Sequence, residues 1–484
     1  MTQEIRQLEP KALWNCFADL NAIPRASKKE DQVISFVKSF GEKLGLETIE
    51  DSVGNVIIRK PGTIGYEHKS MVILQSHLDM VHQKNASTQF DFDREGIKMF
   101  IENDWVKADG TTLGADNGIG VASIMALLAS DNIPHPPLEA LFTIDEETGM
   151  TGALGLKGGL LKGSILLNLD TEDDDELTIG CAGGVDITGQ GNYELEDTAD
   201  EMTGFRLIVR GLTGGHSGMD IHRGRGNANK LMNRLLYKVH ELYGVRISHL
   251  EGGSLRNAIP RESFAILAVP INQQESFKKH IADSAKLLKK EYHTTDPNLA
   301  IELIAAELPK TVMQEEFQDR FIASIYSCPN GIYRMSPDID GLVQTSNNIA
   351  RIVAKDGEVS VMCLARSSSD TEKVDIGQSV SSSLELGGLT VTFSGSYPGW
   401  QPKPESEIVT LMRQLYGELF RGEPKVLACH AGLECGILGT HYPHIDMVSF
   451  GPNIKGAHSP DERVQISSVQ KFWGYLLETL KRIS

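Results

Sequence analysis

The stretch Met71-Val-Ile-Leu-Gln-Ser-His-Leu-Asp79 carries the pattern on which the fold prediction rests. Its first four residues are apolar and predict a buried strand, and His77 and Asp79 follow that strand at once. In an extended chain, residues two positions apart point to the same side. The Asp79 carboxylate can therefore hold one imidazole nitrogen of His77 and leave the other nitrogen free for a metal ion.

Strand and helix patterns alternate through the first part of the chain and return near its end. This alternation predicts an α/β fold, a sheet with helices on both faces. Open sheets of this class bind ligands beyond the carboxyl ends of their strands. We expect strands at 56–58, 71–75, 138–144, 164–169 and 444–450, and helices at 28–44, 118–128 and 466–483.

The middle of the chain follows another order. From 203 to 308 the expected order is strand, helix, two strands, helix and strand, as in a ferredoxin-like unit, and 335–394 repeats part of it. This repeat suggests an internal duplication. An insertion into a surface loop costs little entropy, so we expect a discontinuous catalytic domain, 1–186 and 397–484, interrupted by a lid domain at 187–396.

Composition excludes several classes of protein. The 47 basic and 65 acidic residues among 484 give a net charge of −18, which would repel nucleic acid and anionic membranes. The apolar runs are far shorter than the ~20 residues of a transmembrane helix. The N-terminal sequence lacks a secretory signal pattern, and the six cysteines form no disulfide framework. We expect a cytoplasmic protein without a nucleic-acid or membrane partner.

Two further segments carry acidic groups after predicted strands. In the glycine-rich segment 113–120, Asp116 could cap the following helix, the turn could cradle a phosphate, or the carboxylate could bridge two cations. Glu146 and Glu147 follow the strand at 138–144. Such a pair could form a solvated acidic turn. Alternatively, one acid could bind metal while the other acts as general base.

The remaining candidates follow the last two strands of the pattern. Asp170 comes directly after the strand at 164–169, and His458 lies in the loop after 444–450. Five potential ligands at the ends of strands make a stronger case than any one of them. Two histidines, two aspartates and a glutamate suit zinc better than magnesium or calcium, which rarely bind histidine.

In this order the motifs resemble those of the co-catalytic dinuclear zinc exopeptidases, a family that includes carboxypeptidase G and bacterial dipeptidases. The stretches 108–120, 143–152 and 430–436 resemble its aminoacyl-histidine dipeptidase branch, also called peptidase D or Xaa-His dipeptidase. The resemblance covers essentially the whole chain. It implies a mixed-sheet catalytic domain with an inserted α+β, ferredoxin-like lid.

The resemblance also implies a dinuclear centre with two zinc ions per subunit, for which cobalt or manganese could substitute. Asp116 would bridge the two ions. His77 and Asp170 would complete one site, and Glu147 and His458 the other.

Further roles follow from the same resemblance. Asp79 would orient His77 and Glu146 would be the general base, while His216 of the lid would stabilise the oxyanion formed from the substrate carbonyl. Asn257 and Arg366 would hold the substrate's C-terminal carboxylate, a task for which the fork of arginine is suited. Glu434 would lie near the substrate amine. The acidic run 172–176 is expected to be a solvated loop.

The implied reaction is hydrolysis of unblocked dipeptides, with Xaa-His preferred and β-alanyl-histidine included, by a zinc-bridged water. Aspartate rather than glutamate at Asp170 favours a dipeptidase over a carboxypeptidase. An N-acyl amino acid deacylase and an aminopeptidase of broader specificity stay open as alternatives. A non-catalytic relative is disfavoured because no ligand or base is missing. Whether His216 serves its own subunit or the partner of a homodimer is also open.

Overall fold

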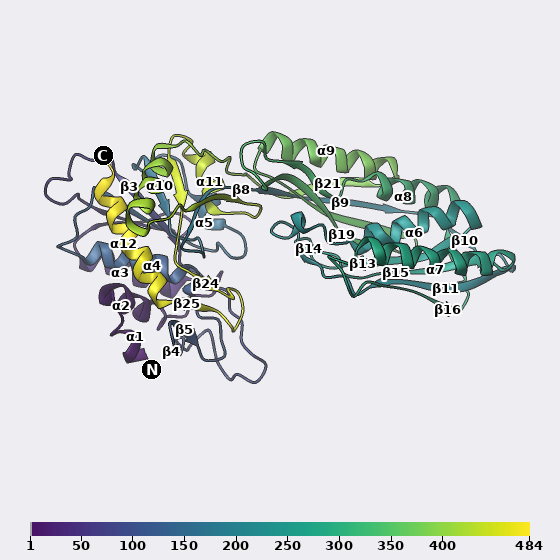
Figure 1. Cartoon of the computed structure of the whole chain (residues 1–484), viewed down its shortest axis with the longest axis horizontal. Coiled ribbons are helices and arrows are strands. Elements are labelled where there is room, and N and C mark those ends of the chain that lie inside the picture. The colour runs from purple at the N-terminus through teal and green to yellow at the C-terminus, as the bar shows by residue number, and fades with distance from the viewer. Residues whose placement is uncertain (1) are drawn as a thin grey trace. The chain divides into compact units, whose positions relative to one another are not determined.

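The computed structural model describes residues 2–484, and the chain divides into two compact units (Figure 1). Unit 1 consists of Met1–Gly180, Pro402–Ala428 and Leu433–Ser484. Unit 2 consists of Cys181–Gln401 and Cys429–Gly432.

Unit 1 is built on a mixed sheet of eight strands. The strands β6, β3, β7 and β23 are parallel neighbours, so their carboxyl ends meet at one edge of the sheet. The outer strands β1, β2 and β8 pair antiparallel to their neighbours. In sheet order the strands are β1 (Glu47–Glu50), β2 (Val56–Lys60), β6 (Leu138–Thr143), β3 (Val72–His77), β7 (Ile165–Asn168), β23 (Asp446–Ser449), β8 (Glu176–Cys181) and β22 (Lys425–Cys429).

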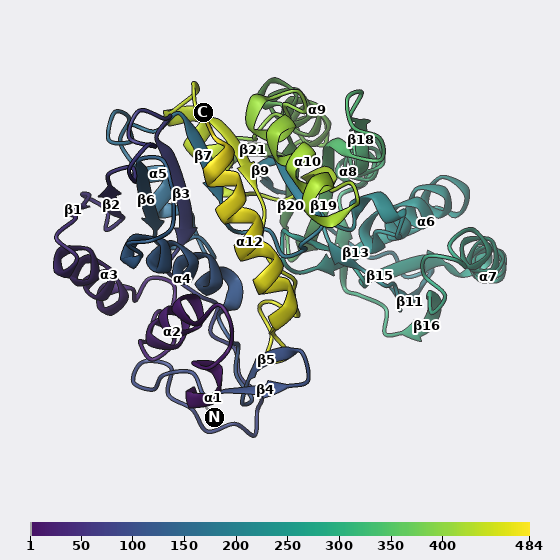
Figure 2. The same cartoon turned by 60° about the vertical axis from the view of Figure 1, so that its left-hand side comes forward.

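Helices cover this sheet, and Figure 2 shows α4 and α12 running across it. Nearly every side chain of α4 is buried, and small residues let it pack closely on α2 and β3. The helices are α1 (Thr2–Ile5), α2 (Lys11–Leu20), α3 (Asp31–Lys43), α4 (Ala115–Ala129), α5 (Thr151–Gly155), α10 (Glu407–Phe420), α11 (Glu434–His441) and α12 (Ile466–Arg482). A small sheet adds β24 (Ile454–Lys455), β25 (Arg463–Gln465), β5 (Trp105–Ala108) and β4 (Met99–Glu102).

Unit 2 is built on an antiparallel sheet of nine strands. In sheet order these are β16 (Ala300–Ala306), β11 (Met202–Arg210), β15 (Ser263–Pro270), β13 (Arg246–Gly253), β19 (Val343–Lys355), β20 (Glu358–Ser367), β9 (Gly183–Asn192) and β21 (Thr390–Tyr397), and β18 (Gly331–Met335) pairs with β19. Its α-helices are α6 (Ala228–Tyr243), α7 (Gln274–Glu291), α8 (Glu315–Ser327) and α9 (Asp370–Leu386). Two short ribbons join β10 (Leu195–Asp197) to β17 (Thr311–Met313) and β12 (Gly215–His216) to β14 (Ala258–Ile259).

This sheet contains two ferredoxin-like arrays. In the first, the chain order is β11, α6, β13, β15, α7 and β16, and the last strand lies beside the first. In the second, the order is β9, α8, β19, β20, α9 and β21, and again the last strand lies beside the first. The arrays join where β13 pairs with β19. In each array the helices pack on the sheet. A single apolar core runs through both arrays.

Sequence analysis missed two elements of the second array, the helix α8 and the first strand, β9. The strand β9 precedes the whole first array in the chain, and its four glycines weaken the strand signal. The expected boundary between 186 and 187 therefore lies inside β9, and the boundary between 396 and 397 lies inside β21. The compact units instead divide after Gly180 and after Gln401.

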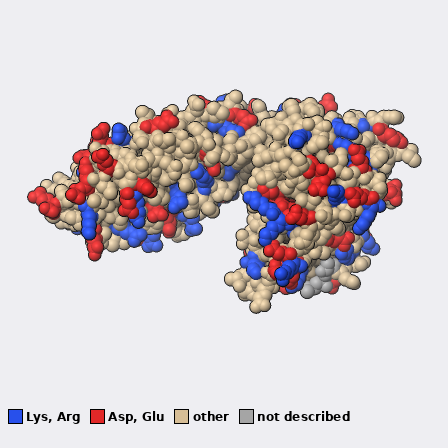
Figure 3. Space-filling view, turned by 180° about the vertical axis from the view of Figure 1, so that it is seen from behind, with Lys and Arg blue, Asp and Glu red and all other residues tan. Residues whose placement is uncertain are grey.

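The surface and core agree with an ordinary globular composition. Acidic and basic side chains are interspersed on the face shown in Figure 3. Four of the six cysteines are buried, Cys181, Cys328, Cys363 and Cys435. Within residues 2–484, no helix combines the length and the apolar character that crossing a membrane requires.

Candidate active site

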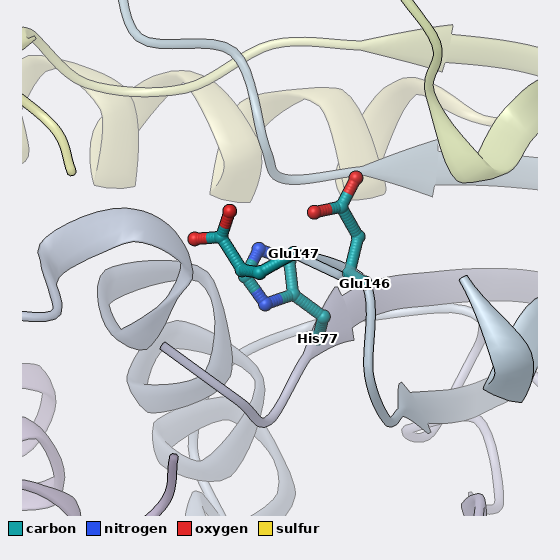
Figure 4. Close-up of side chains that lie close together, drawn as sticks. All are labelled: His77, Glu146 and Glu147. Atoms are coloured by element: carbon teal, nitrogen blue, oxygen red, sulfur yellow. The ribbon is translucent and has the colours of Figure 1, made fainter. Parts of the chain in front are cut away.

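The candidate ligands of unit 1 gather at the edge where the parallel strands end. His77 is the last residue of β3, and Glu146 and Glu147 lie in the loop after β6. Figure 4 shows the carboxylates of both glutamates on the same side of the His77 ring. Asp170 follows β7, His458 lies in the loop between β24 and β25, and Asp116 stands in the first turn of α4. The structure thus brings all five sequence-predicted ligands together.

Asp116 lies between two imidazoles. Its Oδ1 is 3.2 Å from His77 Nε2, and its Oδ2 is 3.2 Å from His458 Nε2. Asp170 Oδ1 lies 3.5 Å from the same nitrogen of His77, and Glu147 Oε2 lies 2.9 Å from that of His458. Each carboxylate oxygen of Asp116 therefore belongs to a separate group of ligands, as a bridge between two cations requires.

The donor set fits two divalent metal ions. Within each of the two groups, His77 with Asp116 and Asp170, and Asp116 with Glu147 and His458, the ligand atoms lie within 4.8 Å of one another. Glu147 Oε1 and Asp170 Oδ1 are buried without a hydrogen-bond partner among residues 2–484. Buried carboxylate oxygens are costly unless a cation compensates them, and imidazole with carboxylate is a common ligand set for zinc.

The charges of the site favour a cation. Hydrogen bonds to Asp116 and Glu147 raise the pKa of His458 to about 11. Burial lowers the pKa of His77, but the charge of Asp170 and hydrogen bonds to carboxylates raise it well above its ordinary value. Both shifts reflect the negative charge of the carboxylates around the two imidazoles.

Asp79 does more than the orienting role expected for it. Its Oδ1 lies 3.3 Å from His77 Nδ1, and it accepts a hydrogen bond from the amide of Glu146 at 3.1 Å. Its Oδ2 accepts from the amide of Glu147 at 3.2 Å and from Ser27 Oγ at 2.8 Å. One buried carboxylate therefore orients the imidazole and also holds the backbone of both glutamates.

Glu146 belongs to neither of the two ligand groups that share Asp116. Ligand atoms of Glu146, His77 and Glu147 lie within 4.8 Å of one another. Burial, opposed by the charge of His77 and reinforced by that of Asp170, raises the pKa of Glu146 well above its ordinary value. Burial therefore favours the protonated form of this carboxyl group.

Glu434, at the start of α11, lies beside the same edge. Its Oε2 accepts hydrogen bonds from Gln75 Nε2 at 2.7 Å and from Thr143 Oγ1 at 2.6 Å. Its Oε1 is buried without a hydrogen-bond partner among residues 2–484. Burial raises the pKa of this carboxyl group to about 7. Glu434 therefore keeps one carboxylate oxygen, Oε1, available as a hydrogen-bond acceptor.

The glycine-rich turn before α4 does not offer its amides to a phosphate. The carboxylate of Glu462 accepts hydrogen bonds from four consecutive amides of this turn, those of Leu113, Gly114, Ala115 and Asp116. Sequence analysis missed Glu462, although it stands only four residues after His458. It also missed Arg25, a fully buried arginine bonded to the same turn.

The structure places 172–175 in a loop, as expected for a solvated run, and the side chains of Asp173 and Asp175 are 41% and 44% exposed. The residues of this run are partly buried, and three of its aspartates form ion pairs with lysines. The pairs are Asp173 with Lys455, Asp174 with Lys471 at 2.8 Å and Asp175 with Lys425 at 2.9 Å. Burial and the charges of Asp116 and Asp170 raise the pKa of Glu172 to about 8. Glu172 thus adds a further acid to the surroundings of Asp116 and Asp170.

In unit 2, His216 lies on the short strand β12, which pairs with β14. Its Nδ1 accepts hydrogen bonds from the amides of Gly218 at 3.2 Å and Met219 at 3.0 Å. This contact assigns the proton of the neutral ring to Nε2. Burial and the charge of Arg366 lower the pKa of His216. The side chain is therefore a neutral donor through Nε2.

Arg366 of β20 is 5 % exposed and has unused donors. Its Nη1 donates to the Tyr397 hydroxyl at 2.9 Å, while its Nε is buried without a partner among residues 2–484. A Cβ atom at Gly218 would lie 3.2 Å from this Nε and 2.0 Å from the carbonyl oxygen of His430. The turn after His216 therefore packs directly on Arg366 and His430.

His430 is a second lid residue of this cluster that sequence analysis named only within a motif. Its Nε2 lies 2.7 Å from Ser346 Oγ, and burial with the charge of Arg366 lowers its pKa to about 3. Asn257 is exposed, and its carbonyl oxygen accepts from the Ser217 amide at 2.7 Å. Unit 2 thus holds a positively charged group among neutral donors, as an anion site requires.

Known proteins resemble this chain over most of its length. The model of peptidase family M20/M25/M40 matches residues 73–482. The chain is 43% identical to the cytosol non-specific dipeptidase of Escherichia coli (strain K12) over 480 residues, which is 99% of each protein.

Solved structures give the same relation. The crystal structure of aminoacylhistidine dipeptidase from Vibrio alginolyticus has 43% identity and a TM-score of 0.94, over 99% of this chain and 98% of the other. A tripeptidase from Staphylococcus aureus shares the fold, with a TM-score of 0.58 and 17% identity over 98% of this chain and 99% of the other. The family match covers most of the chain, and one curated relative matches almost all of it. This chain is a member of peptidase family M20/M25/M40.

Proposed function

We propose that this protein is a metal-dependent dipeptidase that hydrolyses unblocked dipeptides at a dinuclear centre in unit 1. The observation that carries the proposal is the placement of the two Asp116 oxygens against two separate imidazoles. Relatives that match nearly the full chain are named as dipeptidases, which supports the same substrate class.

Zinc is the metal that we assign to the centre, with cobalt or manganese as substitutes. Two imidazoles and three carboxylates suit zinc, and hard cations such as magnesium seldom bind histidine. His77 and Asp170 would hold one ion, Glu147 and His458 the other, and Asp116 both. When bound, two such ions supply Lewis-acid activation of a water molecule and of the scissile carbonyl.

Glu146 is the general base of the proposed reaction. It takes a proton from the attacking water and passes it to the leaving amine nitrogen. The burial that raises its pKa suits both steps, because the protonated form must persist long enough to act as an acid. Asp79 fixes the backbone of this base through the Glu146 amide.

Three residues of unit 2 have proposed roles toward the substrate. His216 donates from Nε2 to the oxyanion, because its Nδ1 is occupied by backbone amides. Arg366 binds the C-terminal carboxylate through its unpartnered Nε, and Asn257, whose carbonyl oxygen accepts from the Ser217 amide, is assigned to the same carboxylate. A carboxylate bound at this arginine would also limit substrate length, since a third residue places a neutral amide there.

Glu434 is the proposed contact of the substrate amine. Gln75 and Thr143 occupy one of its oxygens, and the other is free to accept from an ammonium group. A free amine would neutralise this buried carboxylate, whereas an acylated nitrogen would not. This difference favours a dipeptidase over an N-acyl amino acid deacylase.

The preference for Xaa-His, including β-alanyl-histidine, rests on relatives rather than on a contact. The Vibrio enzyme is named for aminoacyl-histidine substrates, and the Escherichia coli enzyme is named as non-specific. The broader-specificity aminopeptidase is therefore the second candidate. The name of the Escherichia coli relative also supports a cytoplasmic location.

The bridging role of Asp116 is tested by Asp116→Ala. We expect this variant to lose both metal ions, since one carboxylate offsets the repulsion between two dications. Zinc content measured by elemental analysis after gel filtration checks the result. Asp93→Ala, which removes an exposed acid paired with Lys29, is the matched control and should keep the wild-type content. Two full equivalents of zinc in Asp116→Ala would contradict the bridge.

The neighbouring glutamates offer a matched pair for the general base. Glu146→Gln should keep both metal ions and lose turnover by roughly 10²–10⁴-fold, because the proton acceptor is gone. Glu147→Gln should instead lose metal from one site. Zinc content and kcat are measured on the same preparations. A Glu146→Gln enzyme with a tenth of wild-type turnover would remove this residue from the mechanism.

For His216, we expect His216→Ala to lower kcat by roughly 10²–10³-fold with a small change in KM, since the oxyanion exists only in the transition state. Steady-state kinetics on one dipeptide measure both constants. Mixing inactive His216→Ala and Glu146→Gln proteins then tests a shared site. Recovered activity would mean that His216 serves a partner subunit in a homodimer, and none would favour action within one subunit.

A substrate panel tests the proposed class. Free dipeptides should be cleaved faster than their N-acetyl forms and faster than tripeptides, and a chelator should abolish activity until zinc returns. Rates of Xaa-His and Xaa-Leu pairs at equal concentration measure the side-chain preference. Tripeptides cleaved as fast as dipeptides would overturn the length limit. Preferred cleavage of N-acetyl substrates would support the deacylase instead.

A further inference from the structure

We propose that Glu462 and Arg25 are positioning residues that hold the metal-binding loops in their ligand geometry before metal binds. Neither residue is a ligand in the arrangement above. The inference rests on the proposed metal centre, and it concerns how the chain prepares that centre.

Glu462 is 2 % exposed and acts entirely through the backbone. Its Oε2 accepts from the amides of Leu113 at 2.7 Å and Gly114 at 2.9 Å. Its Oε1 accepts from the amides of Ala115 at 2.7 Å and Asp116 at 3.2 Å. Four consecutive amides thus converge on one carboxylate, as the amides of an anion-binding nest do.

The irregular start of α4 leaves these amides in need of an acceptor. Asp116 and Asn117 have non-helical backbone angles, so the regular part of α4 begins only after them. The first amides of a helix lack partners within the helix, and a buried amide without a partner is costly. Glu462 therefore determines the path of the backbone that carries Asp116, the carboxylate between the two imidazoles.

Arg25 ties the same turn to the loop after His77. Its Nη1 donates to the carbonyl oxygens of Leu78 at 3.0 Å and Asp79 at 3.2 Å. Its Nη2 donates to the carbonyl oxygen of Gly114 at 2.6 Å. One fully buried guanidinium thus connects the backbone next to His77 with the backbone before Asp116.

Asn21 and Gly114 make this contact feasible. Asn21 Oδ1 accepts from Arg25 Nη2 at 3.0 Å, and Asn21 Nδ2 donates to the carbonyl oxygen of Leu113 at 2.9 Å. Gly114 has a φ of 70°, and a Cβ atom there would lie 2.4 Å from Arg25 Nη2. Only glycine combines that conformation with so close an approach of the arginine.

Three ligand-bearing segments are joined in this way: the end of β3, the turn before α4 and the loop of His458. Because Glu462 stands in the His458 loop, its hydrogen bonds also tie that loop to Asp116. If the ligands already have their binding geometry, less free energy is lost in ordering them when metal binds. Residues behind the ligands commonly change metal affinity by roughly 10–100-fold.

The test is the zinc affinity of Glu462→Gln. Glutamine keeps the size of the side chain, but its amide nitrogen would face two of the four donors and lose those hydrogen bonds. We expect zinc dissociation constants, measured by competition with a chromophoric chelator, to rise by about 10–100-fold. Turnover should recover when zinc is in excess. Dissociation constants equal to those of the wild type would overturn the inference.

Asp51→Asn is the matched control. The Asp51 Oδ1 accepts from the amides of Val53, Gly54 and Asn55, and its Oδ2 accepts from Asn55 Nδ2 at 2.7 Å, so this change also removes the charge that strengthens a set of hydrogen bonds. The thermal stability of both metal-free variants is measured by circular dichroism. Asp51→Asn should lose stability and keep its zinc affinity. An equal loss of zinc affinity in Asp51→Asn would mean that Glu462→Gln acts through general destabilisation. That result would overturn the inference.

Arg25→Lys supplies a second variant should Glu462→Gln fail to fold. A single ammonium cannot reach two groups of acceptors in the way that the arginine fork does, so zinc should again bind more weakly. Unchanged affinity in Arg25→Lys would contradict the role of this arginine. A wild-type protein that binds no zinc would overturn the proposed metal centre together with this inference, whereas wild-type binding with unaltered variants overturns the inference alone.

Discussion

Repulsion among buried carboxylates is the constraint on which the active-site edge of unit 1 depends. Asp116, Glu147 and Asp170 crowd around two imidazoles, with further acids behind them. Buried like charges are tolerated only where cations or directed donors compensate them. The chain meets this constraint in two ways, with oxygens left free at the centre, where we propose that metal ions bind, and with donors supplied to the acids around it.

The acids around the centre are compensated mainly by backbone amides. Asp79 binds the amides of Glu146 and Glu147, and Glu462 binds the amides of the turn that carries Asp116. In each case a carboxylate that is not a ligand stabilises the loop that presents one. Such contacts orient ligands and tune them at the same time, which explains why so much of the unit 1 edge is polar yet buried. Unit 2 follows the opposite pattern, with an arginine among neutral histidines.

The local pattern of the sequence predicted much of this. Apolar runs followed by acids or histidine indicated β3, β6, β7 and β23, and parallel pairing brings their carboxyl ends together as expected. The two arrays of unit 2 were only half visible, because glycine-rich β9 gives a weak strand signal and lies far from its array in the chain. The expected domain boundaries therefore cut two strands of that sheet.

By itself, the sequence determined the α/β class and the acidic character of the site and predicted the candidate ligand set, since each depends on residue type and on spacing within a few positions. Only the tertiary structure decided which groups compensate the buried polar groups of the two units. Glu462 reaches amides that are 346 to 349 residues away, Arg25 reaches Gly114 across 89, and His430 reaches Ser346 across 84. Contacts of this range follow from how strands and helices pack, because no periodicity in the chain relates one end of such a pair to the other.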